Sequence, residues 1–134
     1  MEKYLGSWKS QESEGFEDYL KALGVALPLR KIASMQNPRV SLTDDGDGLY
    51  TVVTATTFKT HTVQFKLGEE LDESTPDGRD VKTVFHLDDE GKLVQTQMLK
   101  GEVSSKLARE IIDGKLKITA TAGTAVYIRT YVKE

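Results

Sequence analysis

The chain has 134 residues, of which 38% are hydrophobic and 29% charged, a composition typical of one globular domain spanning residues 1–134. It has no apolar run long enough to span a bilayer and no apolar segment of a secretory signal, so we expect a cytoplasmic protein, small enough to enter the nucleus. The absence of cysteine excludes disulfides and thiol catalysis, two isolated histidines argue against a metal site, and a net charge of −3 argues against nucleic acid as a partner.

Two short helices are predicted near the N-terminus, after an opening strand at Gly6–Ser10. Apolar side chains recur at the spacing of an amphipathic helix at Phe16, Tyr19, Leu20 and Leu23. Gly24 is placed to end this helix, and Pro28 suits the first turn of a second helix that continues to about Met35. The pair, about residues 16–36, is too small to be a domain, so its apolar stripe must pack on another part of the chain.

Basic residues are concentrated in and around this helical pair. The segment from Leu20 to Arg39 contains Lys21, Arg30 and Lys31 but no acidic residue, whereas the chain as a whole is acidic. A basic patch on an acidic body attracts anionic partners, and we expect transient contact with anionic membranes through these three residues. A solvated helical surface with no special role is the alternative interpretation.

From Arg39 onward the pattern changes to short strands separated by turns. Strands are predicted at residues 40–43, 49–57, 58–67, 81–87, 92–99, 103–112, 115–121 and 125–132. Asp113-Gly114 is the strongest hairpin signal, and links of hairpin size describe an antiparallel meander. The strands are long and mix polar with apolar residues on both faces, as at Gln95 and Gln97. This mixture favours a barrel with a partly polar interior over a tightly packed sandwich, with the helical pair capping one open end.

The last predicted strand places an arginine between two tyrosines. Side chains in a strand alternate faces, so Tyr127, Arg129 and Tyr131 share one side. If that side faces the interior, the guanidinium needs an anion, because an unpaired buried charge is very unfavourable. If it faces solvent, Arg129 is an ordinary surface residue. The residues alone leave both interpretations open.

Six stretches match the sequences of one protein family and occur in the same order along the chain. They are Leu5–Lys9, Phe16–Val25, Thr56–Lys59, Phe65–Glu73, Arg109–Leu116 and Gly123–Tyr131. On these stretches the chain resembles the intracellular fatty-acid-binding proteins of the heart, adipocyte and myelin type, over essentially its whole length. The resemblance implies an all-β fold, a ten-stranded antiparallel up-and-down β-barrel (β-clam) with an N-terminal helix-turn-helix lid. It also implies that a ligand is held inside the barrel.

The resemblance assigns the ligand carboxylate to Arg129 and Tyr131, with Arg109 as a second interior arginine. Members that bind retinol carry glutamine at the two arginine positions, so the pattern implies an acid rather than an alcohol. Phe58 resembles the aromatic gate of the family's portal. The full set of pocket positions carried over beside the anion site is Phe16, Tyr19, Leu20, Val25, Ala33, Pro38, Thr54, Thr56, Phe58, Asp77, Arg79, Leu107, Ile118 and Ala120.

Several of these positions also have purely structural interpretations. The apolar stripe of the first helix is explained equally well by packing on the barrel rim, and Phe58 by a core position at a strand end. Asp77 and Arg79 are either ligand or cavity-water contacts, or simply a turn acid and its neighbour.

The sequence also makes predictions about the location of four further residues. Trp8 is expected to pack at the closed end of the barrel without a ligand role, and His61 and His86 are expected on the surfaces of their strands. Tyr127 stands where the family commonly has a smaller residue, and it would narrow the cavity if it pointed inward.

The function expected on these grounds is that of a non-enzymatic, monomeric carrier of a long-chain fatty acid, without a cofactor. Retinoic acid or another hydrophobic carboxylate is the alternative ligand, and membrane docking during lipid transfer is a second hypothesis for its activity. A lipid-modifying enzyme finds no support, because the chain offers no cysteine nucleophile, no Ser-His-acid arrangement and no metal-ligand cluster.

Overall fold

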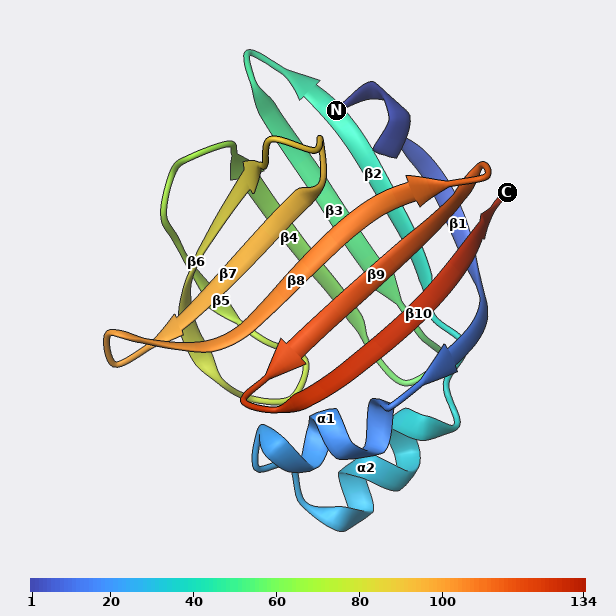
Figure 1. Ribbon diagram of the computed structural model, residues 1–134, viewed down its shortest axis with the longest axis vertical. Coiled ribbons are helices and arrows are strands. Elements are labelled where there is room, and N and C mark those ends of the chain that lie inside the picture. The colour runs from blue at the N-terminus through green and yellow to red at the C-terminus, as the bar shows by residue number, and fades with distance from the viewer.

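The computed structural model describes residues 1–134, and its ten antiparallel strands form a single sheet that curls into a nearly closed barrel (Figure 1). A short 3-10 turn, η1 (Glu2–Tyr4), precedes the first strand. The strands are β1 (Gly6–Glu14), β2 (Arg39–Gly46), β3 (Leu49–Ala55), β4 (Thr60–Lys66), β5 (Leu71–Ser74), β6 (Asp80–Leu87), β7 (Leu93–Leu99), β8 (Glu102–Ile112), β9 (Lys115–Ala122) and β10 (Ala125–Lys133). The predicted fold class, a ten-stranded up-and-down barrel with a helical lid, is confirmed.

Strands that are consecutive in the chain pair with each other, except β4 and β5, and β1 also pairs with β10. The sheet runs β4-β3-β2-β1-β10-β9-β8-β7-β6-β5, so the first and last strands meet in its middle. Strands β4 and β5 are the two ends of the sheet, and no backbone ladder joins them. We call the line between them the seam.

Alternation of side chains explains the mixed polarity of the strands. In β7, Leu93, Gln95 and Gln97 are all buried, so two amides face the interior on the same side as a leucine. In β9, Leu116 and Ile118 are buried at alternate positions. The hairpin predicted at residues 113–114 is present, and both of its residues have positive φ, 53° and 75°, as a type I′ turn requires.

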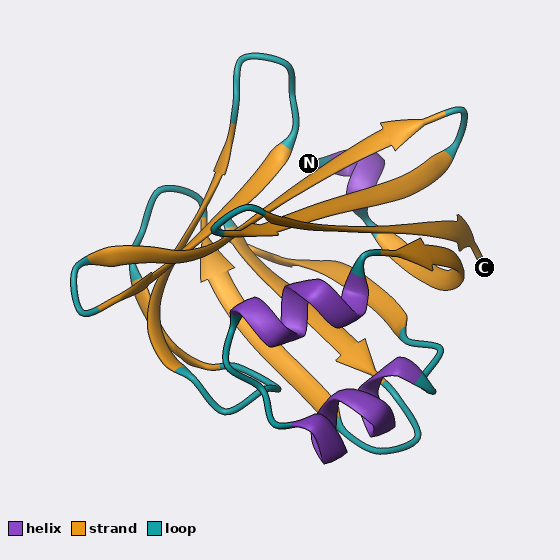
Figure 2. Cartoon of the chain, turned by 60° about the horizontal axis from the view of Figure 1, so that its bottom comes forward, coloured by secondary structure: helices purple, strands orange, loops and turns teal.

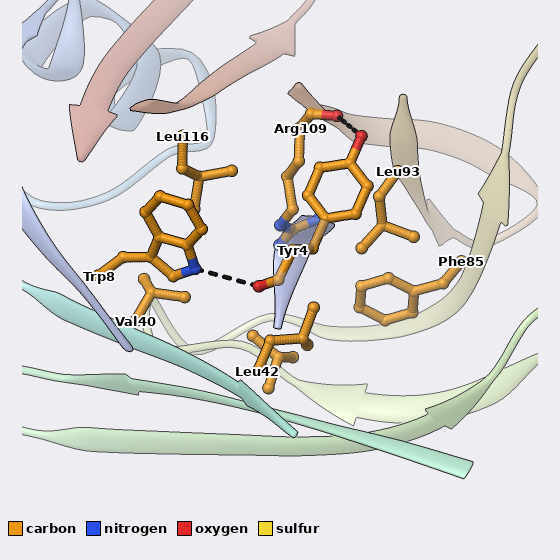
Figure 3. A pocket seen from close by; sticks show the side chains of 9 residues that line it. Tyr4, Trp8, Val40, Leu42, Phe85, Leu93, Arg109 and Leu116 are labelled. Atoms are coloured by element: carbon orange, nitrogen blue, oxygen red, sulfur yellow. Dashed lines mark hydrogen bonds between the residues drawn. The ribbon is translucent and has the colours of Figure 1, made fainter. Parts of the chain in front are cut away.

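The end of the barrel near the N-terminus is filled by a hydrophobic core (Figure 3). The indole Nε1 of Trp8 donates to the carbonyl oxygen of Tyr4 (3.0 Å), and the Tyr4 hydroxyl donates to the carbonyl oxygen of Arg109 (2.9 Å). Phe65 and Phe85 stack with ring centroids 3.9 Å apart. The remaining space there is only about 10 Å³. Trp8 therefore packs at the closed end, as predicted.

Two helices, α1 (Phe16–Ala22) and α2 (Leu27–Ser34), lie across the opposite end (Figure 2). Helix α1 packs against β9 and β10, where Tyr19 and Leu20 join Ala120 in a small buried cluster. Helix α2 has no buried residue and is held chiefly through α1. The predicted helical pair is thus present and begins and ends within about two residues of the expected positions. Neither helix is long and apolar enough to cross a membrane.

Three details of the strand prediction are wrong. Strand β1 continues to Glu14, four residues beyond the predicted end at Ser10. Strand β5 was not predicted from the pattern, because it has only four residues and just two of its side chains face inward. Phe58 lies in a bend between β3 and β4 rather than in a strand, because the Thr56 hydroxyl accepts hydrogen bonds from the backbone N–H groups of Phe58 (3.2 Å) and Lys59 (2.9 Å).

Candidate ligand-binding site

Between the lid and the closed-end core, the barrel encloses a cavity of about 290 Å³. Of the 29 residues that line it, 14 are hydrophobic, so the wall is about half polar, as the mixed strands predicted. A cavity with a large apolar surface and a few convergent charged groups is the usual form of a small-molecule site.

Strand β10 carries the first cation of the cavity. Arg129 is 5% exposed, which excludes the interpretation that it faces solvent. Its Nε donates a hydrogen bond to the hydroxyl of Tyr127, and its guanidinium carbon lies 5.3 Å from the ring centre of Phe16 and 5.5 Å from that of Tyr127. Aromatic rings from the lid and the strand therefore hold the guanidinium in place.

Tyr131 lies two residues further along the same face and is 4% exposed. Its hydroxyl makes no hydrogen bond within the protein, and burial raises its pKa above the ordinary value of a tyrosine. The phenol therefore stays protonated at neutral pH and remains a hydrogen-bond donor. A neutral donor beside a guanidinium suits a carboxylate.

Arg109 on β8 is the second cation, and its side chain lines both the main cavity and the small space at the closed end. Its Nη2 donates to Oε1 of Gln95 (2.9 Å), and its guanidinium carbon lies 5.5 Å from the ring centre of Phe85. Its Nη1 is buried and has no partner. Burial lowers the pKa of Arg109 to about 10, which still leaves it charged at neutral pH.

The third arginine of the cavity is already neutralised within the protein. Arg79 forms a two-bond ion pair with Asp77, with Nε–Oδ2 and Nη2–Oδ1 distances of 2.6 and 3.1 Å. It also donates to Ser104 Oγ (2.9 Å) and Gln97 Oε1 (3.1 Å). Asp77 and Arg79 therefore line the cavity and at the same time fix the turn between β5 and β6.

An acidic residue that the sequence analysis did not assign completes the polar wall. Glu73 is 7% exposed, and its Oε1 accepts hydrogen bonds from Gln95 Nε2 (3.0 Å) and Gln97 Nε2 (3.2 Å). Its Oε2 lies 2.8 Å from Nε2 of His61. The prediction that His61 lies on the strand surface is wrong, because this ring lines the cavity. The alternation in β4 could have revealed it, since His61 shares its face with the buried Val63 and Phe65.

The charges around the cavity do not balance. Three arginines, at positions 79, 109 and 129, face two carboxylates, at positions 73 and 77. Lys59 also lines the cavity, but it is exposed at the outer rim. The interior therefore has room for the charge of one monovalent anion.

The structure brings the residues of the predicted site together with one exception. All of them line the cavity except Ala120, which is fully buried under α1 beside Tyr19 and Leu20. Tyr127, which was expected to narrow the cavity if it pointed inward, does point inward. Its ring centre lies 4.6 Å from that of Phe16 and 5.4 Å from that of Tyr19. Contact of these residues with a ligand stays a prediction.

Comparison with known proteins agrees with this architecture. Residues 5–134 match the model of the lipocalin / cytosolic fatty-acid binding protein family. Fatty acid-binding protein 5 of Pygoscelis papua is 40% identical over 133 residues, which cover 99% of this chain and 98% of that protein. The crystal structure of Echinococcus granulosus fatty-acid-binding protein 1 superposes with a TM-score of 0.94 at 37% identity, covering 99% of this chain and 98% of the other. A Schistosoma mansoni fatty acid binding protein, solved in complex with arachidonic acid, has a TM-score of 0.92 at 39% identity, with coverage of 100% and 98%. The chain belongs to the lipocalin / cytosolic fatty-acid-binding protein family.

Proposed function

We propose that the protein is a non-enzymatic carrier that holds one long-chain fatty acid inside the barrel and works in the cytoplasm as a monomer. Arg129 and Tyr131 bind the carboxylate, and Arg109 is the second cation. The observation that carries this proposal is the buried Nη1 of Arg109, which lacks a partner and belongs to a cavity with one excess positive charge. A carboxylate supplies both an acceptor and the missing charge.

The acyl tail and the head group make different contributions. Burial of hydrocarbon stabilises a complex by ~0.8 kcal/mol per CH₂, so a long tail gives on the order of 10 kcal/mol before the entropic costs of association. A hydrogen bond to a charged group adds a net ~1.5–3 kcal/mol. The tail therefore supplies most of the affinity, while Arg109 and Arg129 orient the ligand and favour acids over neutral lipids.

The Schistosoma mansoni relative, whose structure contains arachidonic acid, supports a long-chain acid as the ligand class. Retinoic acid, or another hydrophobic carboxylate, is the alternative, because it offers the same head group. Mass spectrometry of lipid that copurifies with the protein distinguishes these ligands directly.

Substitution of Arg129 tests the head-group assignment. Arg129→Gln should weaken oleate binding about tenfold or more, since the variant loses charged donors, and should leave binding of oleyl alcohol unchanged. Calorimetric titration with both lipids measures the two affinities. Arg39→Gln, at an exposed position of β2, is the matched control and should alter neither. Unchanged oleate affinity in Arg129→Gln would contradict the assigned role, and an unmodified protein that binds no fatty acid would overturn the carrier function.

A second activity, docking on anionic membranes during lipid transfer, is favoured by the surface around the lid. Apolar side chains are exposed there at Leu27, Leu29, Ile32, Met35 and Phe58. Lys21 and Lys31 are exposed on the same two helices. Arg30 is not equally available, because its side chain is bound to Glu17 Oε1 (2.8 Å) and to the carbonyl oxygen of Val25 (2.6 Å). The apolar side chains can enter the headgroup region while the two lysines face anionic lipid.

A further inference from the structure

The topology of the sheet sets two polar sites on opposite walls of the cavity. Strand β10, which carries Arg129 and Tyr131, lies in the middle of the ten-strand order, whereas β4 and β5 are its two ends. When such a sheet curls into a barrel, its ends meet on the side opposite its middle. The seam between β4 and β5 therefore faces Arg129 and Tyr131 across the cavity, whereas Arg109 on β8 lies nearer to the seam and is linked to Glu73 through Gln95.

A histidine and a glutamate meet at this seam inside the barrel. His61 comes from β4 and Glu73 from β5, and their side chains approach to 2.8 Å where no backbone ladder joins the strands. Both residues line the cavity. Only 4% of the Glu73 side chain and 19% of the His61 side chain are exposed.

This pair keeps hydrogen-bonding capacity for a ligand. Glu73 receives donors from His61, Gln95 and Gln97, which leaves carboxylate lone pairs free. The second ring nitrogen of His61 makes no hydrogen bond within the protein. An unbranched hydrocarbon tail passing this wall would cover polar atoms without offering them a partner, which is unfavourable.

We propose that His61 and Glu73 form a second polar subsite that binds a hydroxyl group part-way along the chain of an oxygenated fatty acid; this inference rests on the proposed carrier function. A hydroxyl has one hydrogen to donate, and it can give it either to a free lone pair of the Glu73 carboxylate or to Nδ1 of a neutral His61 ring whose Nε2–H is donated to Glu73. A second carboxylate would be repelled by Glu73, and an ammonium group would add to the excess positive charge of the interior.

The position of the hydroxyl provides the test. Octadecanoic acid and its positional hydroxy derivatives compete with a fluorescent fatty-acid probe for the unmodified protein. We expect one internal hydroxyl position to bind about tenfold more tightly than octadecanoic acid, the ratio that one charge-assisted hydrogen bond supplies. The 2-hydroxy acid should gain nothing, because its hydroxyl stays beside the carboxylate on the opposite wall. Equal or weaker binding of every hydroxy acid would overturn the proposal.

Two histidine variants separate the subsite from a general effect of polarity. His61→Leu should bring the affinities for the hydroxy acid and for octadecanoic acid closer together, and the ratio of the two affinities in the same variant is the readout. His86→Leu, at the other histidine of the chain, exposed on β6, should retain both. A full preference in His61→Leu would also overturn the proposal, and the positional series decides the question alone if that variant does not fold. Failure of the carrier function has a different signature, namely that octadecanoic acid itself does not bind.

Discussion

At the scale of single residues, the contacts of Tyr127 determine how Arg129 is positioned to bind a carboxylate. Arg129 keeps its terminal nitrogens for a ligand because Tyr127 occupies its Nε, and Tyr127 is itself packed between Phe16 and Tyr19 of the lid helix. This tyrosine therefore connects the proposed carboxylate site to α1. We infer that its hydroxyl positions the guanidinium and that its ring limits the length of chain the cavity accepts.

Tyr127→Phe separates these two contributions. The variant keeps the ring against α1 but removes the acceptor for Arg129 Nε, so oleate affinity should fall a few-fold while oleyl alcohol affinity stays the same. Tyr50→Phe is a matched control, because Tyr50 stacks 5.7 Å from Phe65 and does not line the cavity. Competition titrations of both lipids make the comparison, and an equal loss for acid and alcohol would show that Tyr127 acts through packing alone.

The buried Arg109 makes acid binding depend on pH in the alkaline range. Burial lowers its pKa from the ordinary value of an arginine to about 10, so the charged form disfavours the folded state, and the contribution of this group to stability rises as the pH increases above about 10. A bound carboxylate favours the charged form. Oleate affinity should therefore be constant from neutral pH to about pH 10 and fall as the pH rises through that value.

Fluorescence titrations with oleate on both sides of pH 10 measure this dependence. Tyr131 does not obscure it, since burial raises the pKa of its phenol above the ordinary value. Arg109→Gln should bind more weakly at neutral pH and should lack the alkaline fall. The same fall in Arg109→Gln would assign it to another group.

At the scale of secondary structure, the lid combines one fixed and one loosely held helix. Helix α1 is preceded by a glycine that no other residue replaces easily: Gly15 has φ of 77°, and a Cβ there would lie 2.0 Å from the carbonyl oxygen of Val126 in β10. Close approach of the two backbones at this point anchors α1 on the barrel.

Gly15→Ala should lower the free energy of unfolding by about 2–4 kcal/mol, because left-handed strain adds to a backbone clash. Gly24→Ala is the matched control: its φ is 81°, but a Cβ there meets nothing within 4 Å, so only about 1–2 kcal/mol should be lost. Urea denaturation provides both values. Equal losses would mean that the approach to Val126 relaxes without cost.

The exposed face of the lid makes a prediction about lipid transfer. If the lid docks on membranes, transfer of a fluorescent fatty acid should speed up with anionic vesicles and slow with added salt, since surface attraction is screened. Replacing Lys21 and Lys31 by glutamate should remove the dependence on vesicle charge. Lys66→Glu, at the end of β4 away from the lid, should not. Transfer rates that are independent of vesicle charge in the unmodified protein would exclude this activity.

For the whole molecule, the arrangement of helices and strands could be predicted from the sequence more accurately than the individual side-chain contacts. The helices were predicted because apolar spacing and Gly24 mark them, and the polar interior because amides alternate with apolar residues in β7. The four-residue β5 carries too short a pattern to be recognised alone. The prediction that His61 lies on the surface is wrong because, although histidine is common on surfaces, the alternation of β4 places it on the inward face with Val63 and Phe65. The bond from the Tyr4 hydroxyl to Arg109 joins residues 105 positions apart, and no local pattern encodes such a contact.

The two ends of the barrel differ greatly in how firmly they are packed. Tyr4, Trp8, Phe65 and Phe85 fill the closed end almost completely, whereas α2 buries no side chain at the other end. Local stability follows buried contacts, so α2 can detach at a small fraction of the free energy needed to unfold the strands. If the protein carries a lipid as proposed, the ligand should therefore enter and leave through movement of α2 while the strands of the barrel stay paired.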